Sequence, residues 1–76
     1  MNTEVAIIGA GYVGLPLALR FAQNQVRVSI IDIDESKVQS LRGGKSYINE
    51  IPSEQISQAV QEKLLWPTSD FDGIKS

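Results

Sequence analysis

Apolar positions at the start of the chain predict a strand followed by a helix. Residues 5–8 are a short apolar run, typical of a strand that is buried on both faces of a parallel sheet, and Gly9 ends it. From Tyr12 to Gln23 the spacing becomes helical. The apolar residues that recur at every fourth position of this helix are Val13, Leu17 and Phe21, and Ala18 and Ala22 form an adjacent stripe. The sequence therefore begins like the strand–helix–strand unit of a parallel sheet.

A second strand and a second helix follow. The strand is predicted from Val26 to Ile31, and Asp32 stands at its carboxyl end. Asp34 is expected to cap a short helix from Glu35 to Arg42, because an aspartate side chain accepts hydrogen bonds from the free N–H groups of a first helical turn.

The remaining part of the chain predicts a third helix and then a short strand. Ser53 is expected to cap this helix. The residues predicted to lie on its inward side are Ile56, Val60 and Leu64. Leu65 and Trp66 then begin a strand, and Pro67 confines it to the edge of a sheet because proline has no N–H group. Trp66 is interpreted as a residue of the core or of an interface.

Composition narrows the classes of function that this chain can have. The 76 residues carry 7 Lys+Arg against 9 Asp+Glu, a balance that argues against a nucleic-acid binder and against a polybasic membrane anchor. Cysteine and histidine are both absent, which excludes disulfides, thiolate metal sites and thiol nucleophiles. No apolar run approaches the ~20 residues of a membrane span, so we expect a cytoplasmic chain with no membrane, nucleic-acid or metal partner.

The residues that follow the first strand match the pattern GxGxxG. They are Gly9, Ala10, Gly11, Tyr12, Val13 and Gly14. The first glycine permits a tight turn, the second lets the backbone approach a pyrophosphate, and the third lets the helix pack closely against the strand. Free N–H groups and the dipole at the start of the helix favour a bound phosphate. The alternative is that these glycines only make turns, but the flanking strand and helix favour a dinucleotide site.

Asp32 strengthens this interpretation because it ends the second strand, roughly 20 residues beyond the glycine pattern. A carboxylate there accepts hydrogen bonds from ribose hydroxyls and repels the extra phosphate of NADP, so the predicted cofactor is NAD. FAD proteins share the glycine pattern. Ile33 beside Asp32 is a further candidate for cofactor binding. Lys37 stands in the first turn of the next helix, where its spacing alone favours a solvated surface lysine over a contact with the adenosine phosphates.

Together these features predict an α/β fold, a partial Rossmann domain with a doubly wound parallel sheet. Residues 1–76 are expected to be the truncated N-terminal half of an NAD-binding domain, with the first βαβ unit, further helices and a short edge strand. In the usual strand order 3-2-1-4-5-6 the first strand is central, so here residues 5–8 would form an open, apolar edge. Such edges recruit other strands, and we expect a homo-oligomer that pairs through residues 5–8.

The whole chain also resembles a known family. Residues 5–18, which include the string GYVGLPLA, are similar to the start of the UDP-glucose/GDP-mannose dehydrogenase family. Residues 43–53, with the string GGKSYINEIPS, resemble the branch that acts on UDP-N-acetylglucosamine and related sugars, and residues 68–71 resemble its TTDF segment. The resemblance implies an NAD-dependent 6-dehydrogenase that makes a uronic acid for polysaccharide synthesis. It also implies that Gly9 to Gly14 and Asp32 hold NAD, with Lys37 as a basic contact.

No catalytic residue is assigned to this chain. The chemistry that the resemblance implies is a two-step oxidation through a thiohemiacetal on a cysteine, and the sequence has no cysteine. We therefore expect this chain to bind NAD without catalysing the reaction, and the UDP-sugar to bind only in a longer protein. The alternatives are a non-catalytic oligomeric fragment and a stand-alone nucleotide-sensing Rossmann module.

Overall fold

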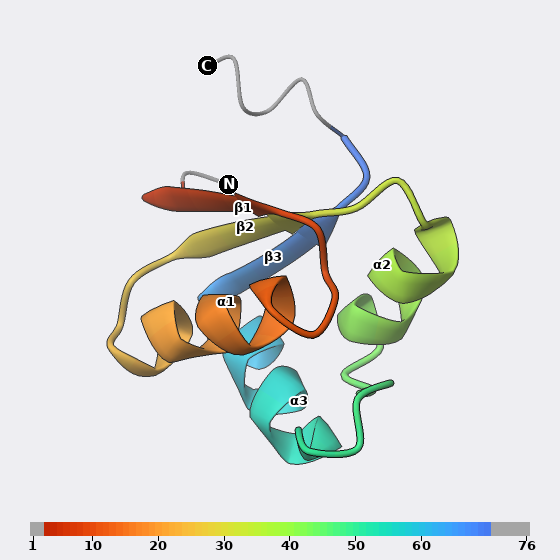
Figure 1. Cartoon of the computed structure of the whole chain (residues 1–76). Helices are drawn as coiled ribbons and strands as arrows, with labels where there is room; N and C mark the ends of the chain where they lie inside the picture. The colour runs from red at the N-terminus through yellow and green to blue at the C-terminus, as the bar shows by residue number, and fades with distance from the viewer. Residues whose placement is uncertain (1–2, 71–76) are drawn as a thin grey trace.

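The computed structural model describes residues 3–70 of the chain. Three parallel strands form one sheet, and they are β1 (Val5–Ile8), β2 (Val28–Ile31) and β3 (Leu65–Thr68). Three helices connect or follow these strands, and they are α1 (Gly14–Gln23), α2 (Glu35–Arg42) and α3 (Ser53–Gln61). The strand order is β1-β2-β3, with β2 in the centre (Figure 1). This arrangement confirms the predicted α/β fold and gives the 3-2-1 half of a doubly wound sheet.

The carboxyl ends of the strands meet at one edge of the sheet. The strands are parallel and aligned, so that Val5 lies beside Val28, and Val28 beside Leu65. Just beyond β1, the Gly9 N–H group donates to the Ile31 carbonyl at 2.7 Å. The glycine-rich turn after β1 therefore lies beside the residues that follow β2.

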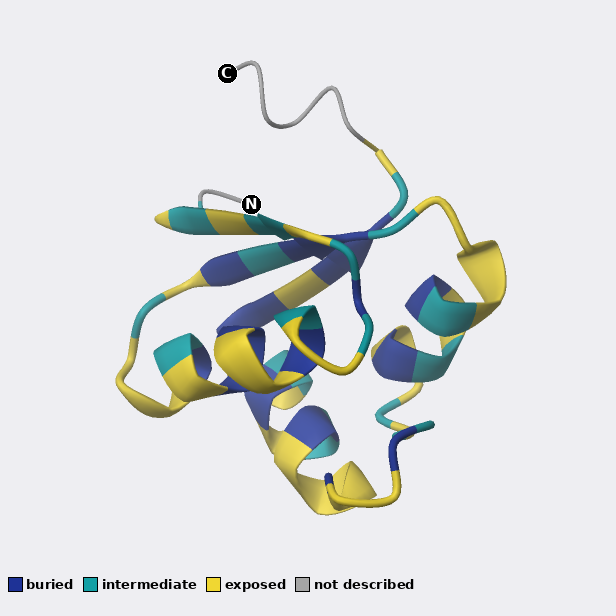
Figure 2. Ribbon diagram, viewed as in Figure 1, coloured by how far each residue is buried: buried dark blue, intermediate teal, exposed yellow. Residues whose placement is uncertain are grey.

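The core lies between the sheet and the helices, which cover one face of it (Figures 1 and 2). The buried residues of α1 are Leu15, Ala18, Leu19 and Ala22. Of the two adjacent apolar stripes predicted for this helix, the one formed by Ala18 and Ala22 is confirmed as buried. The other stripe does not pack as a whole, because Val13 is 81% exposed, Leu17 is exposed and Phe21 is half-buried. The helix begins at Gly14, two residues later than expected, and this start leaves Val13 outside the packed face.

The opposite face of the sheet carries exposed apolar side chains. Alternate residues of a strand face opposite sides, so Ile8 and Trp66 point away from the helices. They are 65% and 42% exposed. The helices of residues 3–70 lie on the other face of the sheet (Figure 1), and only the end of α2 reaches this part of β3, where the Arg42 guanidinium lies 5.9 Å from the centre of the Trp66 ring. The expectation that β1 is buried on both faces was therefore wrong. Trp66 is not a core residue either, and its place in an interface stays a prediction.

Two boundaries differ from the prediction for local reasons. The strand β2 begins at Val28 instead of Val26 because the preceding residues close α1: Gln25 has a φ of 65°, and the N–H group of Val26 donates to the Phe21 carbonyl at 3.0 Å. Ser53 is the first residue of α3 and not its cap. Its hydroxyl instead accepts a hydrogen bond from the Ser46 N–H group at 2.9 Å.

The third helix is also shorter than its apolar pattern suggested. Ile56 and Ala59 are its buried residues, and Val60 is half-buried. Leu64 is buried but lies beyond the helix, which ends before the left-handed residue Lys63 at φ 61°. The prediction that Pro67 stands in an edge strand is confirmed. No helix within residues 3–70 is long and apolar enough to cross a membrane.

The two edge strands of the sheet differ in how their outer peptide groups are paired. At β3, the carbonyl groups of Leu64 and Thr68 face β2 and accept hydrogen bonds from it. The carbonyl group of Pro67 therefore points to the outer edge. Proline has no N–H group there, and Arg42 Nε donates to its carbonyl oxygen at 2.9 Å. At β1, the N–H groups of Val5 and Gly9 face β2, which directs the peptide groups of Ala6 and Ile8 outward. Within the part of the chain that the structure describes, the β3 edge is therefore covered, whereas no strand pairs with the outer edge of β1.

Candidate functional site

The glycine-rich turn brings the backbone of α1 against the backbone of β1. A Cβ atom built on Gly14 would lie 1.8 Å from the Gly9 carbonyl oxygen, a distance that no side chain tolerates. Gly9 has a φ of 99°, in the region that favours glycine. A Cβ atom on Gly11 would meet nothing within 4 Å. The first and third glycines are thus required by the fold, while the second leaves open space in front of the turn.

The N-terminus of α1 faces this open space without a cap of its own. Its N-cap residue is Val13, which makes no side-chain capping hydrogen bond, and the first turn has no acidic residue. The first N–H groups of a helix have no intrahelical acceptor, and with the helix dipole they attract an anion. The side chains of Tyr12 and Val13 are both exposed, so packing within the described residues does not explain them.

Asp32 is fixed beside the turn by two backbone hydrogen bonds. Its Oδ2 accepts from the Ala10 N–H group at 2.9 Å, and its Oδ1 accepts from the Asp34 N–H group at 2.8 Å. These bonds, the one from Ala10 above all, lower the pKa of the Asp32 carboxyl below its ordinary value of 3.8, so it is a carboxylate at neutral pH. Each oxygen keeps a lone pair for a further donor. Ile33, the next residue, is exposed.

Lys37 lies close to Asp32 on the first turn of α2. Its positive charge contributes to the lowered pKa of the Asp32 carboxyl. Its Nζ also lies 5.8 Å from the centre of the Tyr47 ring, in the range of a cation–π contact. The half-buried lysine is therefore held between a carboxylate and an aromatic ring, and not simply surrounded by solvent.

Tyr47 is the residue of this site that the sequence patterns did not indicate. Its hydroxyl donates to the Ala10 carbonyl oxygen at 2.5 Å, across 37 positions of the chain. Burial, together with the negative charges of Asp32 and Asp34, raises the pKa of Tyr47 to about 12. The residue stands in the string that resembles the N-acetylhexosamine branch, which was the available signal, but no spacing rule assigned it a role.

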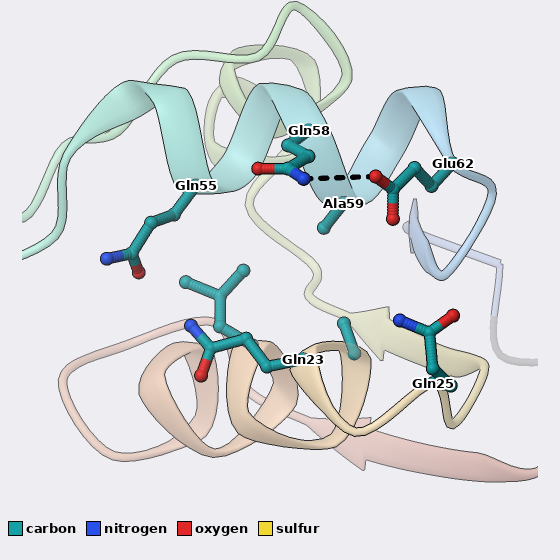
Figure 3. Close-up of a pocket in the computed structure, with 8 residues that line it drawn as sticks. Gln23, Gln25, Gln55, Gln58, Ala59 and Glu62 are labelled. Atoms are coloured by element: carbon teal, nitrogen blue, oxygen red, sulfur yellow. Dashed lines mark hydrogen bonds between the residues drawn. The ribbon is translucent and has the colours of Figure 1, made fainter.

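A cavity lies away from these residues, between α1 and α3. Its volume is about 190 Å³, and four of its eight lining residues are glutamines (Figure 3). One of them, Gln58, donates through Nε2 to Glu62 Oε2 at 3.0 Å (Figure 3). Gln23 and Gln25 place the cavity at the far end of α1, so it is not part of the site at the glycine-rich turn.

The residues at the turn fit the ADP-ribose part of a dinucleotide. Gly11 leaves room for a pyrophosphate, the uncapped start of α1 supplies N–H donors, and Asp32 supplies acceptors for ribose hydroxyls. All of the predicted site residues are therefore gathered at the carboxyl ends of β1 and β2. Within residues 3–70, no group of three Asp, Glu, His or Cys side chains is arranged to hold a metal ion.

Comparison with known proteins gives a consistent result. The sequence model of the UDP-glucose/GDP-mannose dehydrogenase family, NAD binding domain, matches residues 3–75. UDP-glucose 6-dehydrogenase AglM of Haloferax volcanii is 38% identical over 71 residues, or 93% of this chain. UDP-N-acetyl-D-glucosamine 6-dehydrogenase of Salmonella typhi is 35% identical over 74 residues, or 97% of this chain.

A solved structure agrees with the sequence relatives. The structure of a ternary complex of GDP-mannose dehydrogenase from Pseudomonas aeruginosa superposes with a TM-score of 0.85 and 30% identity over 91% of this chain. The chain spans 16% of the length of each of these three proteins. The cofactor of the matching domain is NAD. The chain belongs to the UDP-glucose/GDP-mannose dehydrogenase family, whose NAD-binding domain its sequence matches.

Proposed function

We propose that Gly9 to Gly14, Asp32, Ile33 and Lys37 bind the ADP-ribose part of NAD. The observation that carries the proposal is the contrast between an uncapped helix start and a fully ionised acid beside it. The start of α1 attracts the pyrophosphate. The Asp32 carboxylate accepts hydrogen bonds from the ribose hydroxyls and repels the 2′-phosphate of NADP. Gly11 lets the phosphate approach the backbone.

Calorimetric titration of the chain with NAD and NADP tests this proposal. We expect saturable binding with a preference for NAD. Asp32→Asn should weaken NAD binding by about tenfold or more, because hydrogen bonds to a charged acceptor are among the stronger ones, and it should narrow the preference over NADP. Glu62→Gln makes the same chemical change at the far end of α3 and should leave the affinity unchanged. A folded chain that binds neither nucleotide would contradict the proposal.

We further propose that residues 1–76 supply the first half of the NAD-binding domain of a nucleotide-sugar 6-dehydrogenase. The relatives named above are 6-dehydrogenases of UDP-glucose and of UDP-N-acetyl-D-glucosamine, which supports oxidation of the C6 alcohol of a UDP-sugar to the uronic acid. The three-stranded 3-2-1 sheet supports assignment to the first half of the domain. The test is NAD-dependent oxidation of each UDP-sugar by a longer polypeptide that carries this sequence, with Asp32→Asn as the control.

The open β1 edge supports a second candidate role, pairing of two copies of the chain. Outward peptide groups of Ala6 and Ile8 offer hydrogen bonds, and the exposed Ile8 side chain offers apolar surface. Sedimentation over a wide range of concentration should then reveal a dimer. Ile8→Lys should reduce association, whereas Trp66→Lys on the covered β3 edge should not. A chain that stays monomeric throughout would exclude this role.

A further inference from the structure

The peptide groups of Ala10 are held from two sides. Its N–H group donates to Asp32 Oδ2 at 2.9 Å, and its carbonyl oxygen accepts from the Tyr47 hydroxyl at 2.5 Å. Ala10 itself is only 1% exposed. The two side chains come from different parts of the chain, one from the end of β2 and the other from the loop between α2 and α3. This loop therefore reaches the glycine-rich turn through the Tyr47 hydroxyl group.

The loop of residues 44–52 is itself firmly attached to the protein. Ile48 and Ile51 are buried in the core. The Ser46 hydroxyl donates to the Ile48 carbonyl at 2.8 Å and accepts from the Ile48 N–H group at 3.1 Å. The ring of Tyr47 is half-buried and lies under the Lys37 ammonium group. Tyr47 is thus placed by packing, and its hydroxyl is a fixed donor for the turn.

The hydrogen bond has a direct effect on the next N–H group. The Ala10 carbonyl and the Gly11 N–H belong to one planar trans peptide unit and point in opposite directions. Fixing the carbonyl toward Tyr47 therefore fixes the Gly11 N–H group away from it. Glycine at position 11 imposes little conformational restriction of its own, so this peptide unit depends on outside contacts for its orientation.

We propose that Tyr47 is a positioning residue of the dinucleotide site, which couples the loop of residues 44–52 to the orientation of the Gly11 N–H group. The inference rests on the proposed NAD site and adds to it a residue outside the GxGxxG pattern. With a pKa of about 12, the hydroxyl stays protonated at neutral pH and remains a donor. Coupling is reciprocal, so a nucleotide at the turn should also stabilise the loop.

The variant that tests the inference is Tyr47→Phe, which keeps the ring beneath Lys37 and removes only the donor. The matched control is Ser46→Ala, which removes hydrogen bonds within the same loop and leaves the turn untouched. Titration with NAD should show about fivefold to tenfold weaker binding by Tyr47→Phe, the usual scale of one lost hydrogen bond, and less than twofold weaker binding by Ser46→Ala.

Amide hydrogen exchange supplies a readout that a purely structural role would not move. In the wild-type chain, NAD should slow exchange across residues 44–52, and in Tyr47→Phe this protection of the loop should be lost. In the free protein, the Ala10 amide, which donates to Asp32, should exchange faster in Tyr47→Phe than in the wild type or in Ser46→Ala, because the second hydrogen bond that holds Ala10 is lost.

The possible outcomes separate the two proposals. Tyr47→Phe that binds NAD like the wild type, with the loop still protected, overturns the positioning role and leaves the NAD site intact. A wild-type chain that binds no NAD refutes the NAD site, and the free-protein exchange then decides the role of Tyr47. Unchanged Ala10 exchange in Tyr47→Phe overturns the inference in that case, and faster exchange supports it.

Discussion

Two helices begin at the same edge of the sheet, and their first turns are built in opposite ways. The helix α2 is capped by its own residues, since Asp34 Oδ1 accepts from the Ser36 N–H group at 3.0 Å and Glu35 adds a negative charge to the first turn. The helix α1 has neither feature, and its N-cap is the exposed apolar residue Val13. Both helices follow a parallel strand directly, so topology does not explain the difference.

The difference indicates which helix start is available to an anion. At α2 the free N–H groups and the dipole are already matched by carboxylates, and the pKa of the Asp34 carboxyl is lowered chiefly by its hydrogen bond from the Ser36 side chain. At α1 the corresponding groups lack any partner side chain at the cap. A phosphate that approaches this edge is therefore repelled by one helix start and attracted by the other, which supports the assignment of the pyrophosphate to α1.

The largest effect is expected from Gly14→Ala, at the point where α1 meets β1. The added methyl group would lie 1.8 Å from the Gly9 carbonyl oxygen, so the helix start must move away from the strand. Because overpacking against backbone atoms cannot be relieved by a side chain, we expect a loss of about 3 kcal/mol or more in the free energy of unfolding. Urea denaturation followed by circular dichroism measures this loss.

Gly11→Ala is the matched control for that change. Its methyl group meets no atom within 4 Å, so the free energy of unfolding should change by less than about 0.5 kcal/mol. NAD binding should nevertheless fall sharply, because the methyl group occupies the space in front of the turn. If Gly14→Ala and Gly11→Ala lost equal free energy of unfolding, the two glycines would not have separate roles, one in the fold and one in binding.

The second prediction gives α1 the negative charge that α2 already has. Val13→Asp places a carboxylate at the start of α1, where the side chain is exposed and its loss removes no packing. The helix dipole should favour this charge by roughly 0.5 kcal/mol, so the chain should become slightly more stable. NAD affinity should fall at least about tenfold, since the same carboxylate repels the pyrophosphate.

Val13→Asn separates charge from size in this experiment. Asparagine matches the shape of aspartate without its charge, so it should reduce NAD affinity far less. If both variants bind NAD equally well and as tightly as the wild type, the start of α1 is not where the pyrophosphate lies. Parallel calorimetric and thermal-unfolding measurements on the two variants provide the comparison.

The third prediction removes the cap of α2. Asp34→Ala deletes the acceptor for the Ser36 N–H group and should lower the thermal unfolding midpoint by a few degrees. The backbone N–H group that holds Asp32 Oδ1 remains, so NAD affinity should change much less than in Val13→Asp. A large loss of affinity would mean that the two helix starts do not act separately.

Local chemistry explains which parts of this arrangement were predictable from sequence. The Asp34 cap and the end of α2 depend on neighbouring residues, and the helix Glu35–Arg42 was predicted with its observed bounds. The glycine pattern was recognisable for the same reason. The packed face of α1 was predictable only in part. Ala18 and Ala22 are buried and Phe21 packs partly against the core, whereas Val13 and Leu17 have helical spacing but are exposed. Periodicity identifies a face without showing what lies opposite it.

Contacts between distant parts of the chain were the least predictable. The hydrogen bond from Tyr47 to Ala10 joins a loop to a turn. No periodic pattern in the sequence relates these two residues, so the contact could not be predicted from it. Likewise, Ser53 has the sequence character of a helix cap, but its hydroxyl binds the N–H group of Ser46 in the same loop. In both cases tertiary structure decides which of several possible partners a side chain takes.

The smallest expected effect concerns Tyr47, which contacts Ala10 in the turn before α1 and Lys37 in the first turn of α2. Its pKa is raised from 10.0 to about 12, first by burial and then by the charges of Asp32 and Asp34. A raised pKa means that the folded chain favours the protonated Tyr47 hydroxyl. The contribution of this hydroxyl to stability is therefore complete below pH 10 and is lost as the pH rises toward 12. Solvent screens the charge on the half-buried side chain. In free energy, this change in stability should therefore be smaller than the change in NAD affinity caused by Val13→Asp. Urea denaturation between about pH 9 and pH 11.5 should show a steeper loss of stability in the wild type than in Tyr47→Phe, and parallel curves would contradict the raised pKa of Tyr47.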